Sequence, residues 1–391
     1  MKILILTSKL PYPATGADEQ DRFEGLRLLK ELGHELRVIA KVAAYQKEED
    51  VETLSRAITS KVETLPYRGS GFSMRRLFDI GFWDGAAYEY ADPGTVRALT
   101  RAIGEFKPDC VWLDGSFMWP LISVAHSAGL PVVVRSLQIE STHIIADEGA
   151  SPINLLRAYV KGVGEARMAR TADVVIAINR NEAVRYEEMG AKHLETVPLR
   201  QLPSLLEKGG IEYRDARPLH VLFTASTFSV THNRIGAENV IRKIAPELDA
   251  RAPGEFMIHI TGAKLPDKIR SDMPANVTYE GYVPDFDAFM RSIDIAITQS
   301  LGNAGMHGKL FAPVAAGIPT VTQSHALAGF SFAEGEGMVF GESPESVVAH
   351  LLSLREKGAR EKIGKAGLKQ AEHLFSRTAL KMAITRALDA L

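Results

Sequence analysis

A glycine-rich segment in the last third of the chain has the residue types of an anion site. Residues 299–306 (QSLGNAGM) follow an expected strand, and Lys309 lies in the first turn of the helix expected next. Free backbone N–H groups and the positive end of a helix dipole favour a bound phosphate. A lysine at this end is unfavourable unless an anion lies beside it. We therefore predict that Gly305, Met306, His307 and Lys309 contact the phosphates of a ligand. The alternative is a simple turn with a solvated lysine.

A second polar loop follows the strand expected at Val221–Ala225. It contains Ser226, Asn233 and Arg234. Arg234 is again a cation near a helix start, where a bound anion would stabilise it. We predict that these three side chains contact the same phosphates, and an exposed polar loop is the alternative.

Polar side chains in the first half of the chain could contact a second substrate. Arg135 ends an expected strand, and Glu140 and His143 follow it. Gly16 lies in a Pro/Gly loop after the first strand. Ligands of open α/β sheets bind at the carboxyl ends of the strands, so we assign these four residues to an acceptor or a transferred sugar. A structural ion pair between Arg135 and Glu140 is the alternative.

The triplet Asp285-Phe286-Asp287 has the form of a metal-binding D-x-D motif. It falls where a strand turns into a helix, and aspartate is a good N-cap at such a position. We therefore interpret it as a cap. Histidines, cysteines and acidic residues do not cluster with metal-ligand spacing elsewhere, so the sequence predicts neither a metal ion nor a cofactor.

The elements that position these residues alternate between strand and helix. Short apolar runs are bounded by polar or Gly/Pro turns, which predicts parallel sheets covered on both faces. The linker is expected at 201–217, with an N-terminal domain at 1–205 and a C-terminal domain at 218–391, whose last helix is free to pack back on the first domain. The expected strands are 2–7, 35–40, 110–113, 131–135, 174–178, 221–225, 256–261, 277–282, 294–298 and 319–322. The fold class is α/β, with two doubly wound Rossmann-like domains facing across a cleft.

Composition sets further limits. The 391 residues are 46% hydrophobic and 24% charged, values typical of globular proteins. A net charge of -2 gives no reason to expect a nucleic-acid partner. The single cysteine, Cys110, rules out a disulfide within the chain and indicates a cytoplasmic location. The apolar start, residues 2–6, is too short for a membrane span, so any membrane contact is expected to be peripheral.

Residues 305–321 (GMHGKLFAPVAAGIPTV) resemble the donor-site segment of family-4 GT-B glycosyltransferases, G-M-R-x-K-x-x-E-A-x-A-x-G-x-P-V-V. Three further segments are similar to that family: Gly33-His34-Glu35, residues 135–141 (RSLQIES) and residues 280–285 (EGYVPD). The resemblance implies the GT-B fold and transfer of a sugar from a nucleotide-diphosphate donor to a glycan or lipid-linked acceptor. It also implies retention of configuration, no metal ion, and a role in surface polysaccharide or glycoconjugate synthesis.

Three positions depart from the family pattern. Ala312 and Ala304 stand where the family carries glutamates, and Leu137 stands where it often has a histidine. The first glutamate normally binds the ribose of the donor. The replacements leave three alternatives: other residues hold the ribose, the donor is unusual, or the chain is a non-catalytic relative that acts as a binding or scaffold protein. An epimerase of related architecture is a further alternative, but such enzymes rely on carboxylates and histidines that the matching positions of this chain do not show.

Overall fold

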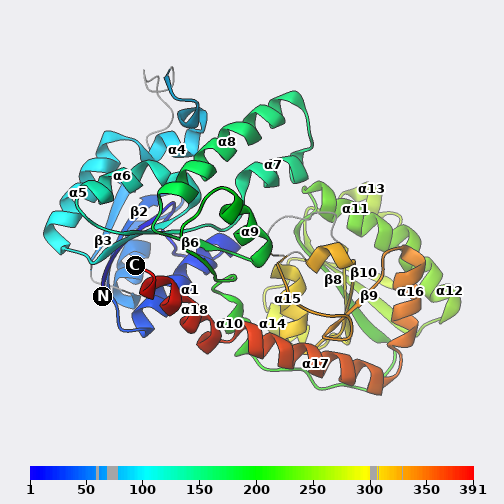
Figure 1. Cartoon of the computed structure of the whole chain (residues 1–391). Coiled ribbons are helices and arrows are strands. Elements are labelled where there is room, and N and C mark those ends of the chain that lie inside the picture. The colour runs from blue at the N-terminus through cyan, green and yellow to red at the C-terminus, as the bar shows by residue number, and fades with distance from the viewer. Residues whose placement is uncertain (59–60, 68–77, 300–305, 307, 328) are drawn as a thin grey trace. The chain divides into compact units, whose positions relative to one another are not determined.

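The computed structural model describes residues 1–58, 61–67, 78–299, 306, 308–327 and 329–391. The chain forms two compact units (Figure 1). One contains residues 1–201 and 377–391, and the other contains residues 202–299 and 308–376. Each unit has its own parallel sheet and its own buried apolar core.

The first unit is built on a parallel sheet in the order β3-β2-β1-β4-β5-β6-β7. The strand order reverses between β1 and β4, as in a doubly wound sheet. Helices cover both faces, so the central strands are continuous runs of Val, Ile and Leu rather than alternating patterns. The strands are β1 (Lys2–Thr7), β2 (Glu35–Val42), β3 (Val62–Pro66), β4 (Cys110–Asp114), β5 (Val132–Arg135), β6 (Val174–Ala177) and β7 (Leu194–Thr196).

Capping side chains set where several helices of this unit begin. Asp92 accepts a hydrogen bond from the Thr95 backbone at the start of α5, and Ser151 accepts one from the Asn154 backbone at the start of α8. Both helices then have proline in the first turn, where its missing N–H costs nothing. The helices are α1 (Ala17–Glu31), α2 (Glu48–Ala57), η1 (Ile80–Trp83), α4 (Gly85–Tyr90), α5 (Pro93–Phe106), η2 (Ser116–Leu121), α6 (Ile122–Ser127), α7 (Glu140–Glu148), α8 (Pro152–Thr171), α9 (Arg180–Glu188) and the C-terminal α18 (Arg377–Asp389).

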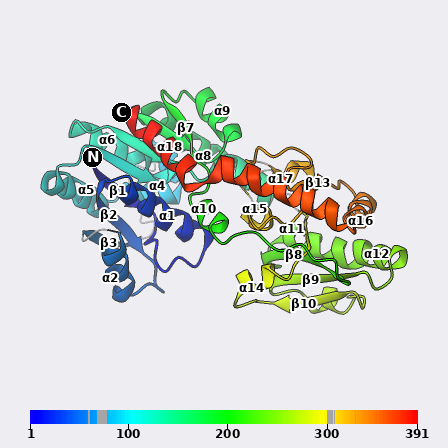
Figure 2. The ribbon, with the colours of Figure 1, turned by 90° about the horizontal axis from the view of Figure 1, so that it is seen from below.

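The C-terminal helix α18 belongs to the first unit, although it follows the second in sequence. It lies beside β7 and α1 (Figure 2). Leu380 and Ile384 are buried in one apolar cluster with Ile3 and Ile5 of β1. Arg377 and Lys381 form ion pairs with Glu31 of α1. The last helix therefore completes the core of the N-terminal half.

The second unit has a six-stranded parallel sheet in the order β10-β9-β8-β11-β12-β13. Its strand order reverses between β8 and β11. The strands are β8 (Leu219–Thr227), β9 (Phe256–Ala263), β10 (Val277–Gly281), β11 (Ile295–Thr298), β12 (Thr320–Thr322) and β13 (Met338–Phe340). The helices are α10 (Leu202–Leu206), α11 (Thr231–Asn239), η3 (Val240–Ile244), α12 (Ala245–Arg251), α13 (Asp267–Arg270), α14 (Phe286–Met290), α15 (Gly308–Ala315), η4 (Ser324–Leu327), α16 (Pro344–Ser353) and α17 (Lys357–Phe375).

The helix that follows β8 is less regular than the sequence suggests. Its pattern predicts one helix over 236–248, whereas the structure has α11, one wider π-helical turn at η3, and then α12. Pro246 lies in the first turn of α12 and has no N–H to donate to the preceding turn. The wider turn before it accommodates this missing hydrogen bond.

No helix within the described ranges is both long enough and apolar enough to cross a bilayer.

Candidate functional site

A polar contact of the second unit lies where the strand order of its sheet reverses. β8 leads into α11, which carries Asn233, and β11 precedes α15, which carries Lys309. Lys309 Nζ donates a hydrogen bond to Asn233 Oδ1 at 3.0 Å. Asn233 is itself held by a hydrogen bond from its Nδ2 to the Thr227 carbonyl at 2.9 Å. The structure thus brings together two predicted site residues that are 76 positions apart in the chain. They meet at the reversal point where open α/β sheets bind ligands.

Lys309 is a partly buried cation, and no acidic residue in the described ranges pairs with it. Burial lowers the pKa of its ammonium group to about 8, and no charged residue among those the structure describes offsets this effect. Withdrawal from water disfavours a charged amine unless an anion replaces the lost solvation. The site is therefore electrostatically incomplete in the free protein and suited to a negatively charged ligand.

Three buried polar atoms at the same edge of the sheet have no hydrogen-bond partner in the described part of the chain. They are Gln299 Nε2, Thr322 Oγ1 and Gln323 Oε1. Gln299 follows β11, and the other two end or follow β12. Buried polar groups without a partner are uncommon in native proteins and cost about 1–3 kcal/mol each. Sequence reasoning missed these residues, although a polar residue directly after an apolar strand is the signal that would have found them.

The other residues predicted to contact phosphate are less buried than Asn233 or lie outside the described residues. Ser226 is exposed near the end of β8, and Arg234 is partly exposed in the first half of α11. Met306 is among the residues that the structure describes, and its side chain is partly buried. Gly305 and His307 lie outside the described residues, as does Ala304. Contact of these residues with a ligand stays a prediction.

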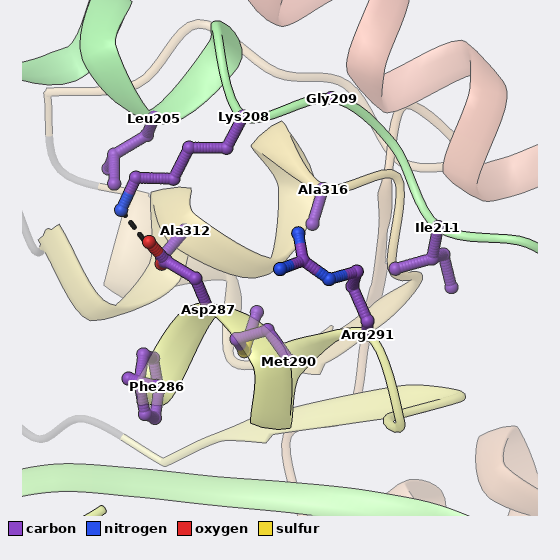
Figure 3. A pocket seen from close by; sticks show the side chains of 10 residues that line it. All are labelled: Leu205, Lys208, Gly209, Ile211, Phe286, Asp287, Met290, Arg291, Ala312 and Ala316. Atoms are coloured by element: carbon purple, nitrogen blue, oxygen red, sulfur yellow. Dashed lines mark hydrogen bonds and ion pairs between the residues drawn. The ribbon is translucent and has the colours of Figure 1, made fainter. Parts of the chain in front are cut away.

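A small cavity of about 100 Å³ lies beside α15 and is lined by Ala312, the position at which the family resemblance predicts a ribose-binding glutamate (Figure 3). Ala312 of α15 and Ala316, directly after that helix, line it, together with Asp287 of α14 and Arg291, directly after α14. Lys208 Nζ and Asp287 Oδ1 form an ion pair of 2.7 Å across its rim. The Arg291 guanidinium points toward the cavity (Figure 3). The cavity beside Ala312 therefore contains two cations, one of them paired with Asp287, which the sequence did not reveal.

The D-x-D triplet supplies the start of α14. Asp285 Oδ1 accepts a hydrogen bond from the Ala288 backbone N–H at 2.8 Å, which confirms the predicted cap. Asp287 pairs with Lys208. Among the described residues there is no group of three or more histidine, cysteine or acidic side chains arranged to hold a metal ion.

Arg135, at the end of β5, has a different environment from the one expected. Its side chain is fully buried and donates hydrogen bonds to the backbone carbonyls of Ala177, Val197 and Pro198. Its nearest carboxylate is that of Asp21, at 3.8 Å, rather than Glu140. No atom of Arg135 is exposed to a ligand in this structure, so its contribution is to hold the ends of three strands in place.

Arg135 is part of a buried network of four charges at the carboxyl edge of the first sheet. Arg200 donates two hydrogen bonds to Asp21 Oδ2, at 2.6 and 2.9 Å, and contacts Asp114 Oδ2 at 3.0 Å. Burial alone would raise the pKa of Asp21, but Arg200 and Arg135 outweigh it and hold the pKa below its usual value. This network joins the start of α1 to the ends of β4 and β7, and so positions the polar loops of this edge.

The other predicted contacts of the first unit line its carboxyl edge. Gly16 precedes α1, and a Cβ there would lie 2.3 Å from Glu19 Oε2, the end of a side chain that would have to move aside. Glu140 begins α7, accepts a hydrogen bond from Gln138 at 3.1 Å, and is three residues before His143 on the same helix. Their contact with an acceptor stays a prediction.

Two family models match the chain. Residues 24–200 match the model described as a glycosyl transferase 4-like domain, and residues 219–357 match the model described as glycosyl transferases group 1. Together the two matches span most of the chain, in the order of its two units. The chain belongs to the GT-B glycosyltransferases. Lys309, Asn233 and the unpaired polar atoms at the edge of the sheet all lie within the group 1 domain of this glycosyltransferase.

Solved structures confirm the predicted GT-B fold. HepE from Anabaena, in complex with UDP, is 15% identical and aligns over 100% of both chains with a TM-score of 0.66. Sucrose-phosphate synthase from Thermosynechococcus elongatus is 12% identical over 100% of this glycosyltransferase and 98% of that chain, with a TM-score of 0.69. A variant of S. aureus TarM is 8% identical over 99% of both chains, with a TM-score of 0.64. Among curated proteins, no sequence matches this chain.

Proposed function

We propose that this glycosyltransferase transfers a sugar from a nucleotide-diphosphate donor to a glycan or lipid-linked acceptor, and that its second unit binds the donor's diphosphate at Lys309. The observation that carries the proposal is a partly buried lysine, at the reversal point of a group 1 domain, with no acidic partner in the part of the chain that the structure describes. A diphosphate supplies the missing negative charge. The similar structures of HepE contain UDP or UDP-glucose, which supports a uridine diphosphate sugar as the first donor to test.

In this reaction the protein must stabilise the leaving group, which is the nucleoside diphosphate. Negative charge grows on the bridging oxygen as the sugar leaves, and a fixed cation beside the phosphates stabilises that charge more than it stabilises the bound donor. Lys309 supplies this charge, and Arg234 is the second candidate. We further propose reaction with retention, without a metal ion, in surface polysaccharide or glycoconjugate synthesis, with the protein contacting a membrane only peripherally.

The test begins with binding and then measures turnover. We expect UDP to bind by calorimetry, and UDP-glucose or another UDP-sugar to release UDP when an acceptor is supplied. Proton NMR of the product then gives the anomeric configuration, and an inverted product would contradict retention. Absence of binding to every nucleoside diphosphate would overturn the proposal.

The alternative is a non-catalytic relative, and Ala312 is the observation that favours it. A relative of this kind would bind UDP without releasing it from any UDP-sugar. Binding and turnover measured on the same preparation therefore separate the two functions.

A further inference from the structure

The hydroxyl group of Tyr90 is buried in the first unit and has no hydrogen-bond partner among the described residues. Tyr90 ends α4 and is 3% exposed. Burial raises the pKa of this hydroxyl well above its usual value, so the group keeps its proton and is a hydrogen-bond donor at neutral pH. A buried donor without an acceptor is unfavourable and uncommon in native proteins. A ligand that accepts this hydrogen bond would remove the cost.

The ionisable groups that act on the Tyr90 hydroxyl come from the carboxyl edge of the first sheet. They include Asp18 and Arg22 of α1 and Tyr67, which directly follows β3. Arg22 Nε donates a hydrogen bond to Asp18 Oδ1 at 3.1 Å. Asp18 Oδ2 accepts none from the residues that the structure describes, and the Asp18 side chain is 44% exposed. An unused donor and a partly exposed acceptor therefore occur together at this edge.

An alcohol is the chemical group that uses both of these side chains. A hydroxyl donates one hydrogen bond and accepts others, so one sugar hydroxyl would accept from Tyr90 and donate to Asp18. A phosphate oxygen only accepts, and its charge would repel the Asp18 carboxylate. An ammonium group only donates, and it would leave the Tyr90 hydroxyl without an acceptor.

Charged side chains around this edge balance one another. They form three ion pairs: Lys9 with Glu19, Arg22 with Asp18, and Lys41 with Glu89. These pairs carry no net charge. An anionic group such as a lipid diphosphate requires a surplus of cations, as Lys309 provides in the second unit. The charge balance at this edge favours a neutral ligand.

Two exposed tyrosine rings border the same edge. Tyr67 is 47% exposed, and its hydroxyl donates to the Ser8 carbonyl. Tyr45, which follows β2, is 54% exposed, and its hydroxyl donates to Glu19 Oε1 at 3.0 Å. A ring held at its hydroxyl keeps its position while its apolar part stays exposed. The face of an aromatic ring is partly negative, so the polarised C–H groups of a sugar pack well against it.

We propose that this edge binds a neutral sugar residue of the acceptor, with one sugar hydroxyl between Tyr90 and Asp18 and the sugar ring against Tyr67. Because Tyr90 Oη is covered in this structure, binding includes a side-chain movement, and we expect the half-exposed Tyr67 to make it. The inference rests on the proposed transfer reaction. It narrows the acceptor contact to a neutral sugar rather than a lipid diphosphate, and it adds residues beside β1 and β3 to the predicted contacts Glu140 and His143.

The test is saturation-transfer NMR of the full chain, without donor, with four neutral trisaccharides: maltotriose, cellotriose, mannotriose and chitotriose. Farnesyl diphosphate is the probe for a lipid diphosphate. We expect at least one trisaccharide to bind and farnesyl diphosphate not to displace it. No binding by any of the trisaccharides would overturn the proposal.

Tyr90→Phe should weaken trisaccharide binding by about three- to tenfold, because one hydrogen bond to the sugar is lost. Its melting temperature should stay equal or rise, because the variant removes an unpaired buried hydroxyl. A purely structural role would instead lower the melting temperature and leave the affinity unchanged. Tyr67→Ala should also weaken binding. The matched control is Tyr159→Ala, at a tyrosine of α8 that is 61% exposed, and it should change neither quantity.

Equal trisaccharide affinity in wild type and Tyr90→Phe would remove this edge from the acceptor site. Binding of farnesyl diphosphate that Tyr90→Phe and Tyr67→Ala both weaken would assign the edge to a lipid diphosphate instead. UDP affinity, measured on the same preparations, separates this inference from the proposed function. UDP binding without trisaccharide binding would refute only the sugar site, and trisaccharide binding without UDP binding would refute only the proposed donor.

Discussion

Lys309 is the residue whose environment is hardest to explain without a ligand. It is partly buried, its hydrogen-bond partner is the neutral Asn233, and its pKa falls to about 8. In the unfolded chain the same group titrates near 10.5. The folded protein therefore binds fewer protons than the unfolded chain between pH 8 and 10.5, so stability should rise with pH across this window. A lysine at this position is unfavourable in the free protein, and we attribute its presence to a role in phosphate binding.

Replacing Lys309 should separate binding from stability. Lys309→Met keeps most of the side-chain volume and removes the buried charge, so the free energy of unfolding should stay equal or increase slightly. UDP affinity should fall by about 10- to 150-fold, because a charge-assisted hydrogen bond of about 1.5–3 kcal/mol is lost. Calorimetry and denaturant unfolding measure the two effects. Lys243→Met, at an exposed lysine of the same unit, is the control and should change neither. Unchanged UDP affinity in Lys309→Met would remove Lys309 from the site.

The same residue predicts how affinity depends on pH. A bound diphosphate raises the pKa of Lys309 above its free value of about 8, so binding above that pH must take up a proton. We expect the Kd for UDP to be nearly constant from pH 7 to 8 and then to rise, approaching about tenfold per pH unit. Calorimetry in buffers of different ionisation enthalpy measures the proton uptake directly. Lys309→Met should show neither the slope nor the uptake.

At the scale of elements, the cavity beside α15 indicates whether the protein would tolerate a glutamate at position 312, where the family resemblance predicts one. Ala312 lines a cavity that Lys208 and Arg291 also line. Lys208 is already paired with Asp287, so Arg291 is the cation in this cavity that would offset the cost of burying a carboxylate at 312. The structure favours tolerance of a glutamate here, a conclusion that the position of Ala312 in the sequence could not supply.

Ala312→Glu should therefore fold with a melting temperature close to that of the wild type and should bind UDP several-fold more tightly, if the ribose lies over this turn of the helix. Differential scanning fluorimetry and calorimetry measure the two quantities. Ala316→Glu introduces the same charge into the same cavity, four residues later and just past the end of α15, and should leave UDP affinity unchanged. A lower melting temperature together with weaker UDP binding in Ala312→Glu would show that the usual ribose position has been closed.

At the scale of the whole molecule, the chain is two units with separate apolar cores. A ligand that binds one unit stabilises that unit by mass action, by about 2.7 kcal/mol when its concentration is 100 times the Kd. We expect saturating UDP to slow hydrogen exchange most strongly in α11 and α15 of the second unit. In the first unit, exchange in β1 and β4 should change much less. Mass spectrometry of peptic fragments measures both. Stronger protection in β1 and β4 than in α11 would place the nucleotide in the first unit.

Much of the fold follows from local sequence patterns. Runs such as Lys2–Thr7 and Val174–Ala177 are apolar on both faces, a property of strands between two helical layers, and the intervening helices have recognisable caps. These features predicted the doubly wound domains, and the 305–321 segment pointed to a glycosyltransferase that the family models confirm. Exact helix ends and the π-helical turn before Pro246 were missed, because they depend on hydrogen bonding along several turns.

Only the tertiary structure decided which polar residues meet. The sequence proposed Lys309 and Asn233 separately, and the pairing of β8 with β11 brings them to 3.0 Å. It proposed Arg135 as a sugar contact, but the packing of Asp21 and Arg200 around it leaves it wholly buried. Residue type and spacing along one segment report local conformation. Which side chains are buried, and which of them pair, depends on the strand order, because that order brings together residues far apart in the chain. No single segment of the sequence encodes the strand order.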